Sequence, residues 1–189
     1  MIAIRRARPA DAPAIGAVHV AAWRSTYPGI LPDEFLARLS VTRQAAHYDG
    51  AIRAGVGVHV ATASGTDVPG SSAPSPAGPR IVAFVTGDRA RVSGIAEGEI
   101  ETLYVLDDFR ERGLGRRLMR AAASHLIAAG CRSAFVWVLR ENPSRWFYER
   151  LGGKAVAESP IRVAGVPVVQ TAFVWDPIER LLLASPQAS

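Results

Sequence analysis

The chain has 189 residues, of which 49% are hydrophobic, and its formal net charge is +5. This length supports one well-buried α/β domain, and no compositional shift marks a second one. All but one of its 22 basic residues are arginines, and their scatter along the chain argues against a nucleic-acid-binding face.

The single cysteine, Cys131, excludes an intrachain disulfide. It also lacks the ligand spacing of a zinc site, so we expect it to be a small buried residue and expect no metal. No segment approaches the ~18 apolar residues of a membrane span, and no apolar signal-peptide core follows the N-terminal arginines. The sequence therefore predicts a cytoplasmic protein without a membrane partner, and leaves the oligomeric state open between a monomer and a homodimer.

The first part of the chain predicts strands and helices with a low-complexity segment between two of the strands. The elements, in order, are strand 2–6, helix 11–25, one or two helices within 31–53, and strands 56–62 and 80–87. The residues from 64 to 79 are rich in Gly, Ser and Pro. Because such a composition does not pack, we expect a mobile hairpin loop here and not a domain linker.

The second part of the chain alternates strands and helices more regularly. The predicted elements are strand 96–105, helix 114–129, strand 133–139, helix 143–151, and strands 154–162 and 166–175. The order of the whole chain is then β-α-α-β-β-β-α-β-α-β-β. We expect a single domain over 1–176 and a C-terminal tail over 177–189.

A loop rich in arginine and glycine joins strand 96–105 to the helix that begins near Leu114. Glycines at 113 and 115 remove side chains that would keep a ligand away from the backbone. The first N–H groups of the helix are unpaired and positively polarised, as a phosphate group requires. Four arginines add charge around them, namely Arg110, Arg112, Arg116 and Arg117. The alternative is an ordinary strand–turn–helix corner with a solvated basic face.

Two motifs in this order resemble one known family. The Arg-x-x-Gly-x-Gly run from Arg110 to Gly115 resembles the acyl-CoA pyrophosphate loop of the GCN5-related N-acetyltransferase (GNAT) superfamily. The run from Asn142 to Gly153, with its Phe-Tyr-Glu-Arg-Leu-Gly sequence, resembles the later CoA-facing helix of that family. The resemblance covers residues 1–176. It implies an α/β (α+β) fold with a mixed, mostly antiparallel sheet of about seven strands flanked by about four helices.

The resemblance also implies acetyl-CoA as co-substrate. Leu103, Tyr104 and Val105 match the strand end that pairs with the pantetheine amides. The loop residues that match the pyrophosphate contacts are Arg110, Glu111, Arg112, Gly113, Leu114, Gly115 and Arg116, of which Arg110 has the alternative role of bracing the loop. Asn142 matches a cofactor contact, although it stands one residue closer to Tyr148 than the family asparagine does. The alternative is that Asn142 only caps the helix.

The catalytic residues implied are Tyr148, Glu99 and Glu101. Tyr148 matches the family tyrosine that protonates the departing thiolate, and its ordinary pKa of ~10 suits that role. Glu99 falls where histone-acetylating members carry their glutamate base. Period-2 alternation places Glu99 and Glu101 on one strand face, together with Leu103 and Val105, where each carboxylate raises the pKa of the other. The alternative is that they bind a cationic acceptor while ordered water takes the proton.

The segment after the first helix carries Trp23 and Tyr27, which match the acceptor wall of small-molecule and polyamine-type members. Together with an acid, a base and no nucleophile, this predicts direct acetyl transfer to the primary amine of a small, polyamine-like molecule. The alternatives are a protein N-terminal or lysine acetyltransferase, and a non-catalytic acyl-CoA-binding or nucleic-acid-binding module. The length of the acyl chain stays open.

Overall fold

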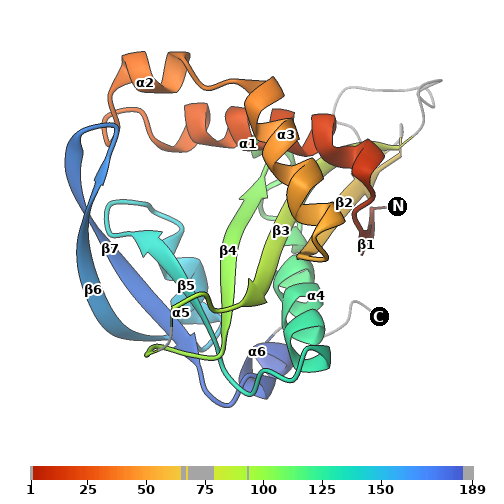
Figure 1. Ribbon diagram of the computed structural model, residues 1–189, viewed down its shortest axis with the longest axis vertical. Coiled ribbons are helices and arrows are strands. Elements are labelled where there is room, and N and C mark those ends of the chain that lie inside the picture. Colours follow the sequence, from red (N-terminus) through yellow and green to blue (C-terminus); the bar gives the residue numbers. More distant parts are fainter. Residues whose placement is uncertain (1, 65–66, 68–78, 93, 185–189) are drawn as a thin grey trace.

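A single twisted sheet organises the computed structural model, which describes residues 2–64, 67, 79–92 and 94–184. Within these residues seven strands follow the order β1-β2-β3-β4-β5-β7-β6 (Figure 1). All neighbouring strands are antiparallel except β4 and β5, which are parallel. The bounds are β1 Ala3–Arg6, β2 Gly57–Ala63, β3 Arg80–Arg89, β4 Gly98–Val105, β5 Ala134–Leu139, β6 Lys154–Val163 and β7 Val166–Trp175.

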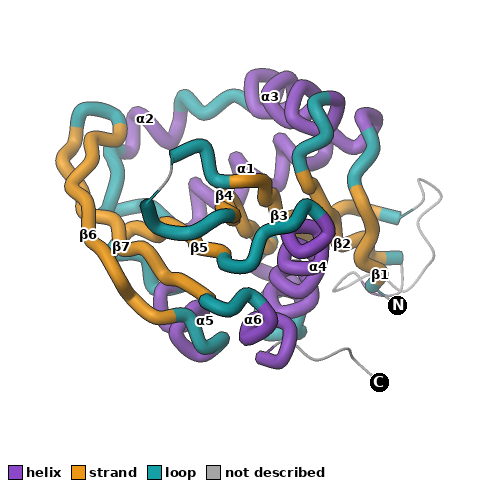
Figure 2. Tube along the Cα trace, turned by 60° about the horizontal axis from the view of Figure 1, so that its bottom comes forward, coloured by secondary structure: helices purple, strands orange, loops and turns teal. Residues whose placement is uncertain are grey.

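Helices cover both faces of the sheet. One face carries α1 and α3, and the other carries α4, α5 and α6, while the short α2 lies between α1 and α3 in the chain (Figures 1 and 2). Their bounds are α1 Ala12–Thr26, α2 Asp33–Ala37, α3 Val41–Arg53, α4 Leu114–Ala128, α5 Arg145–Arg150 and α6 Glu179–Ala184. The predicted α/β (α+β) fold is confirmed, with α2 and α3 as separate helices because Ser40 caps the second one.

The C-terminal segment differs from the prediction of a tail over 177–189. Ile178 is fully buried, and residues 179–184 form α6, whose Leu181 is also fully buried in the same cluster as α4. Ile178 and Leu181 therefore belong to the domain core. Residues 185–189 lie outside the described part of the chain, as does nearly all of the segment 64–79 that was predicted to be a mobile loop.

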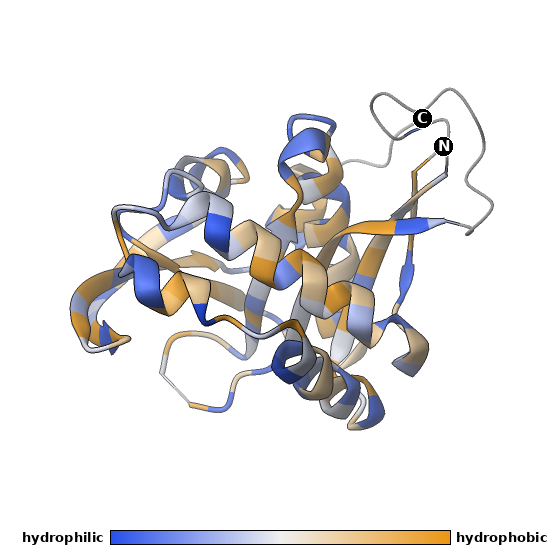
Figure 3. Cartoon of the chain, turned by 90° about the horizontal axis from the view of Figure 1, so that it is seen from above, coloured by the Kyte–Doolittle hydropathy of each residue, from blue (hydrophilic) through white to orange (hydrophobic). Residues whose placement is uncertain are grey.

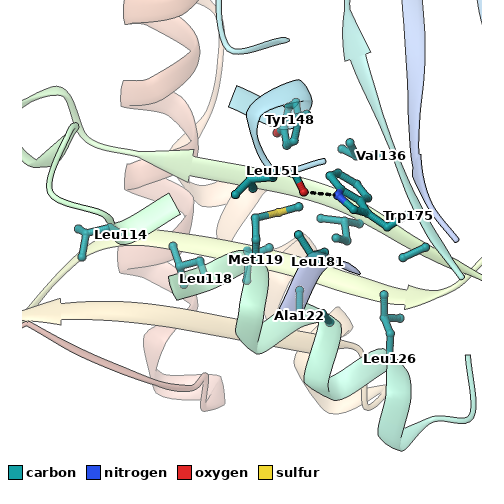
Figure 4. Close-up of a cluster of buried hydrophobic side chains, with 14 of the residues drawn as sticks. Leu114, Leu118, Met119, Ala122, Leu126, Val136, Tyr148, Leu151, Trp175 and Leu181 are labelled. Atoms are coloured by element: carbon teal, nitrogen blue, oxygen red, sulfur yellow. Dashed lines mark hydrogen bonds between the residues drawn. The ribbon is translucent and has the colours of Figure 1, made fainter. Parts of the chain in front are cut away.

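The larger core cluster fixes the position of α4. Leu114, Leu118, Ala122 and Leu126, which recur at four-residue spacing, are all buried against the sheet. Figure 4 shows this cluster together with the Trp175 indole, which donates a hydrogen bond of 2.9 Å to the carbonyl of Leu151 at the end of α5. This packing holds the first turn of α4 and the end of α5 against the same part of the sheet.

The opposite face is covered by a closely packed helix pair. A Cβ atom on Gly16 of α1 would lie 2.8 Å from the backbone carbonyl of Val41 in α3, so glycine allows the two helices to approach. Hydrophobic and hydrophilic residues alternate along the helices in Figure 3, as expected for helices that bury one side. The buried side contributes Ile15, Val18 and Tyr48 to the second core cluster.

His19 on this face predicts a pH dependence of stability. It is 8% exposed, its Nδ1 lies 2.7 Å from the Tyr48 hydroxyl, and burial lowers its pKa to about 4. Between pH ~6.5 and ~4 the unfolded chain binds a proton that folded His19 does not, so stability falls as the pH falls. We expect His19→Gln to remove up to ~1.4 kcal/mol per pH unit of this slope, measured by urea unfolding at pH 7, 6 and 5. An unchanged slope would contradict the assignment to His19.

Candidate active site

The parallel strands β4 and β5 separate along their length. Their pairing is confined to Gly98–Ile100 of β4 opposite Ala134–Val136 of β5. From Thr102 to Val105, β4 pairs with β3 on one side only, so its other edge faces a wedge between β4 and β5. The unpaired N–H and C=O groups on that edge are available to a ligand that binds like an added strand.

A bulge in β4 begins at the same point. Thr86 of β3 faces Thr102, whereas the next residue, Gly87, faces Ile100, so Glu101 is the extra residue. A bulge of this kind bends its strand and changes the direction in which later side chains point. The bend therefore coincides with the opening of the wedge.

The bulge corrects one prediction about the two glutamates. Ile100, Leu103 and Val105 all pack on the α4 side of the sheet, which strict alternation does not allow. Glu99 and Glu101 flank Ile100, so strand alternation at Ile100 places both glutamates on the other side of the sheet. On that side the Glu101 charge adds to burial in raising the pKa of Tyr48 in α3. The prediction that the glutamates share the face of Leu103 and Val105 is thus wrong.

The two glutamates nevertheless lie close to each other. Burial raises the pKa of Glu99, and the charge of Glu101 raises it further, while Arg91 lowers it. Glu101 forms an ion pair with Arg91 at 3.0 Å. The effect of the Glu101 charge on Glu99 agrees with what the sequence predicts for that carboxylate.

One cavity of about 750 Å³ occupies the wedge and extends to both faces of the sheet. Fourteen of the sixteen predicted site residues line it: Trp23, Tyr27, Glu101, Leu103, Tyr104, Val105, Arg110, Glu111, Gly113, Leu114, Gly115, Arg116, Asn142 and Tyr148. Glu99 and Arg112 do not line it. Of the two candidate bases, only Glu101 thus faces the space where substrates would react.

The start of α4 forms one end of this cavity. Gly113 precedes the helix with φ +73°, and a Cβ there would have no atom within 4 Å apart from its chain neighbours. The first backbone hydrogen bond of α4 runs from the Arg117 N–H to the Gly113 carbonyl, so the earlier N–H groups of the helix are free for an anion. Gly115 has a different role, because a Cβ there would lie 3.0 Å from the Phe147 ring of α5.

The loop arginines have different partners. Arg110 pairs with Asp107 at 2.9 Å and donates to the Thr26 hydroxyl at 3.1 Å, so it ties the loop to the end of α1. The Arg112 guanidinium lies 5.0 Å from the Phe109 ring centroid and donates to the Asp67 carbonyl. Bracing is therefore the role that the structure supports for both arginines.

Two further arginines follow the loop in α4. Arg117 donates to the Ile2 carbonyl at 2.9 Å, which ties α4 to the N-terminal residues. Arg116 lines the cavity, and its guanidinium has no partner among the described residues. Of the four loop arginines, Arg116 is thus the one whose charge is available to an anionic ligand.

Tyr148 lies deep in the cavity wall on α5. Its ring stacks on Phe173 with centroids 6.1 Å apart and meets Trp175 edge-on. It is 6% exposed, and burial raises its pKa, with a smaller contribution from Tyr27. The phenol therefore keeps its proton over the whole physiological range and is available as a proton donor.

Asn142 connects two walls of the cavity. The Ser144 N–H donates to its Oδ1 at 2.8 Å, which fixes the amide orientation, and its Nδ2 donates to the Tyr27 hydroxyl at 3.2 Å. The Asn142 and Tyr27 side chains are both buried. The amide thus has one partner on each side within the protein: it caps the turn before α5 and holds the end of α1.

The β6–β7 hairpin forms a wall that the sequence analysis did not identify. Tyr27 and Leu31 pack with Val163 and Val168 of the hairpin, which curves toward α2 in Figures 1 and 2. Its residues Ile161, Val163 and Gln170 line the cavity. Alternation within 154–162 indicates a half-exposed strand, but no local signal shows which helix its tip will meet.

The described residues contain neither a cluster of metal ligands nor a membrane-spanning helix. No three His, Cys, Asp or Glu side chains gather there as potential metal ligands. None of the helices in this part of the chain has both the length and the apolar character to cross a membrane.

Comparisons with known proteins agree with this geometry. Residues 90–162 match the family model described as FR47-like protein. The chain is 30% identical over 181 residues to the uncharacterized N-acetyltransferase YuaI of Bacillus subtilis, covering 96% of each chain.

Solved structures share the fold at lower identity. The PaiA N-acetyltransferase of Thermoplasma acidophilum, in complex with coenzyme A, is 17% identical with a TM-score of 0.63 and 90% and 98% coverage of the two chains. The ribosomal-protein-alanine N-acetyltransferase of Brucella melitensis is also 17% identical, with a TM-score of 0.66 and 92% and 99% coverage. One fold can carry different functions, so this likeness does not identify the acceptor of this chain.

Proposed function

Because the chain belongs to the GCN5-related N-acetyltransferase superfamily, and is thus an N-acyltransferase with acetyl-CoA as donor, we propose that it acetylates the primary amine of a small molecule. The observation that carries the proposal is the cavity itself. It joins the free N–H groups at the start of α4 to Tyr148 and Glu101 through the wedge between β4 and β5. Transfer is direct, since a proton donor and a proton acceptor line this cavity.

The residues present fit acetyl-CoA. Gly113 leaves its backbone open, Arg116 has an unengaged guanidinium, and the edge of β4 from Glu101 to Val105 lacks a partner strand. We propose that the Gly113 backbone and the Arg116 guanidinium bind the diphosphate, and that the free edge of β4 binds the pantetheine amides. When bound there, acetyl-CoA supplies the activated acyl thioester.

Tyr148 and Glu101 divide the proton transfers between them. Glu101 accepts one proton from the acceptor ammonium, directly or through water, and leaves a neutral amine. As the C–N bond forms and the C–S bond breaks, Tyr148 donates its proton to the sulfur. The nitrogen then loses a second proton, and a proton from solvent returns the Tyr148 phenolate to the phenol. Glu99 influences this exchange only through its charge.

Contacts that close the end of the cavity near Tyr27 favour a small-molecule acceptor over a protein acceptor. The Asn142–Tyr27 hydrogen bond ties the end of α1 to the turn before α5. The apolar contacts of Tyr27 and Leu31 with Val163 and Val168 tie the same segment to the hairpin. An extended peptide crossing this end would have to separate both contacts, whereas a small amine would not.

An acceptor screen tests the proposal. Purified protein is incubated with acetyl-CoA and either small primary amines, free-amine peptides or lysine-containing peptides, and free thiol release is followed. We expect turnover with small amines and background rates with peptides. Faster acetylation of peptides, or of ribosomal proteins, would overturn the small-molecule assignment.

The position of Glu101 predicts a difference between the two glutamates. Glu101→Gln is expected to lower kcat/KM by ~10²-fold or more across the pH range, because a general base is lost. Glu99→Gln, whose side chain lies outside the cavity, is expected to lower kcat/KM by less than ~10-fold. The comparison requires kcat/KM between pH 5.5 and 9 for both variants. The opposite pattern would make Glu99 the base.

A further inference from the structure

The charged side chains among the described lining residues of the cavity are mostly cationic. They are three arginines, Arg110, Arg116 and Arg150, and two carboxylates, Glu101 and Glu111. Glu111 belongs to the loop before α4, at the end proposed for the diphosphate. Among the described lining residues, Glu101 is therefore the only carboxylate outside that loop.

Glu101 offers the acceptor a single negative charge. Its present partner, Arg91, is 74% exposed, and exposed ion pairs contribute little stability. A primary ammonium group can therefore replace the Arg91 guanidinium at small cost. A second ammonium on the same molecule would meet no second carboxylate among the described residues that line the cavity, and a desolvated charge without a partner is strongly unfavourable.

The walls beyond Glu101 are largely apolar. They comprise the Trp23 and Tyr27 rings from α1, Leu139 from β5, and Ile161 and Val163 from β6. Four of these, Trp23, Tyr27, Leu139 and Val163, also belong to one hydrophobic cluster. Such walls stabilise an aliphatic or aromatic group and offer nothing to a second cation except the ring faces.

Resting on the proposed function, we infer that the acceptor is a monoamine with an apolar body, bound with its ammonium on Glu101 and its body against these walls. This differs from the polyamine-like acceptor that the aromatic segment around Trp23 and Tyr27 suggested. The aromatic rings suit any ammonium group, whereas the described lining residues outside the loop before α4 provide a carboxylate for only one ammonium group.

A matched pair of amines tests the inference. 1-Aminohexane and 1,6-diaminohexane have the same chain, and differ by one terminal ammonium group. At saturating acetyl-CoA we expect kcat/KM to favour the monoamine by at least ~10²-fold, because the second charge stays unpaired. Ile161→Glu adds a carboxylate to the wall and is expected to raise kcat/KM for the diamine at least ~10-fold while lowering it for the monoamine.

Val156→Glu is the matched control. Val156 lies on the same strand, is 56% exposed and does not line the cavity, so the preference should not change. Circular dichroism and thermal melting establish that both variants fold. Equal use of the two amines by the wild-type protein, or an unchanged preference in folded Ile161→Glu, would overturn the inference while leaving amine acetylation intact. Binding of acetyl-CoA without acetylation of either amine would instead overturn the proposed small-amine function, and this inference with it.

Discussion

Tyr148→Phe is expected to lower kcat by ~10²–10⁴-fold with little change in the affinity for acetyl-CoA, the range for loss of one general acid. The phenylalanine ring keeps the stacking on Phe173 and the edge-on contact with Trp175. Among the described residues the Tyr148 hydroxyl has no hydrogen-bond partner whose loss would disturb the fold. The hydroxyl is needed only as the thiolate departs, so its loss is expressed in the transition state. Steady-state kinetics with calorimetric titration of acetyl-CoA measures both quantities.

A donor with a more acidic thiol provides the control. Such a leaving group needs less protonation, so the deficit of Tyr148→Phe should shrink with it, whereas a packing defect would lower both rates equally. Wild-type turnover in Tyr148→Phe would show that this tyrosine is structural. The proton would then have to come from water or from Tyr27, the other buried phenol of the cavity wall.

Gly113→Val should weaken acetyl-CoA binding sharply while the protein still folds. The new side chain would stand between the ligand and the first N–H groups of α4, and losing two charge-assisted hydrogen bonds costs about 3–6 kcal/mol. No atom beyond its chain neighbours lies within 4 Å of a Cβ at this position, so the fold itself meets no clash. Gly115 is less suitable, because a side chain there would also displace Phe147. Calorimetric titration of acetyl-CoA into the folded variant gives the affinity.

The backbone conformation requires a second variant as control. Gly113 has φ +73°, where valine is strained whether or not a ligand binds. Gly55→Val imposes comparable strain, since Gly55 has φ +87° and open space around it, but it does not line the cavity. We expect Gly55→Val to lose stability and keep its affinity. If Gly113→Val binds acetyl-CoA as tightly as the wild-type protein, the start of α4 does not hold the diphosphate.

The sequence determined the features that depend on local spacing. Residues 114, 118, 122 and 126 repeat at helical intervals, and this alone places one side of α4 in the core. Glycine at 113 before that helix likewise indicated an anion-binding start, because the free N–H groups of a first turn are a property of every helix. The elements of the sheet and the family resemblance followed from the same short-range patterns.

Features that depend on partners distant in the chain were decided only by the tertiary structure. The bulge at Glu101 exists only relative to β3, so alternation along β4 by itself put the glutamates on the wrong face. Arg110 reaches Thr26 and Arg112 reaches Asp67, because long side chains find acceptors that sequence spacing does not reveal.

The cavity wall that we propose for the acceptor shows most clearly which features are local in sequence and which depend on tertiary structure. Trp23 and Tyr27 were predicted as its wall from a local aromatic segment, whereas Val163 joins them only because the β6–β7 hairpin curves back onto that segment. The C-terminal residues give a second example, since Leu181 has a partner only once α4 is in place. Local periodicity specifies which side of an element is apolar, but which element covers that side is settled by packing in three dimensions.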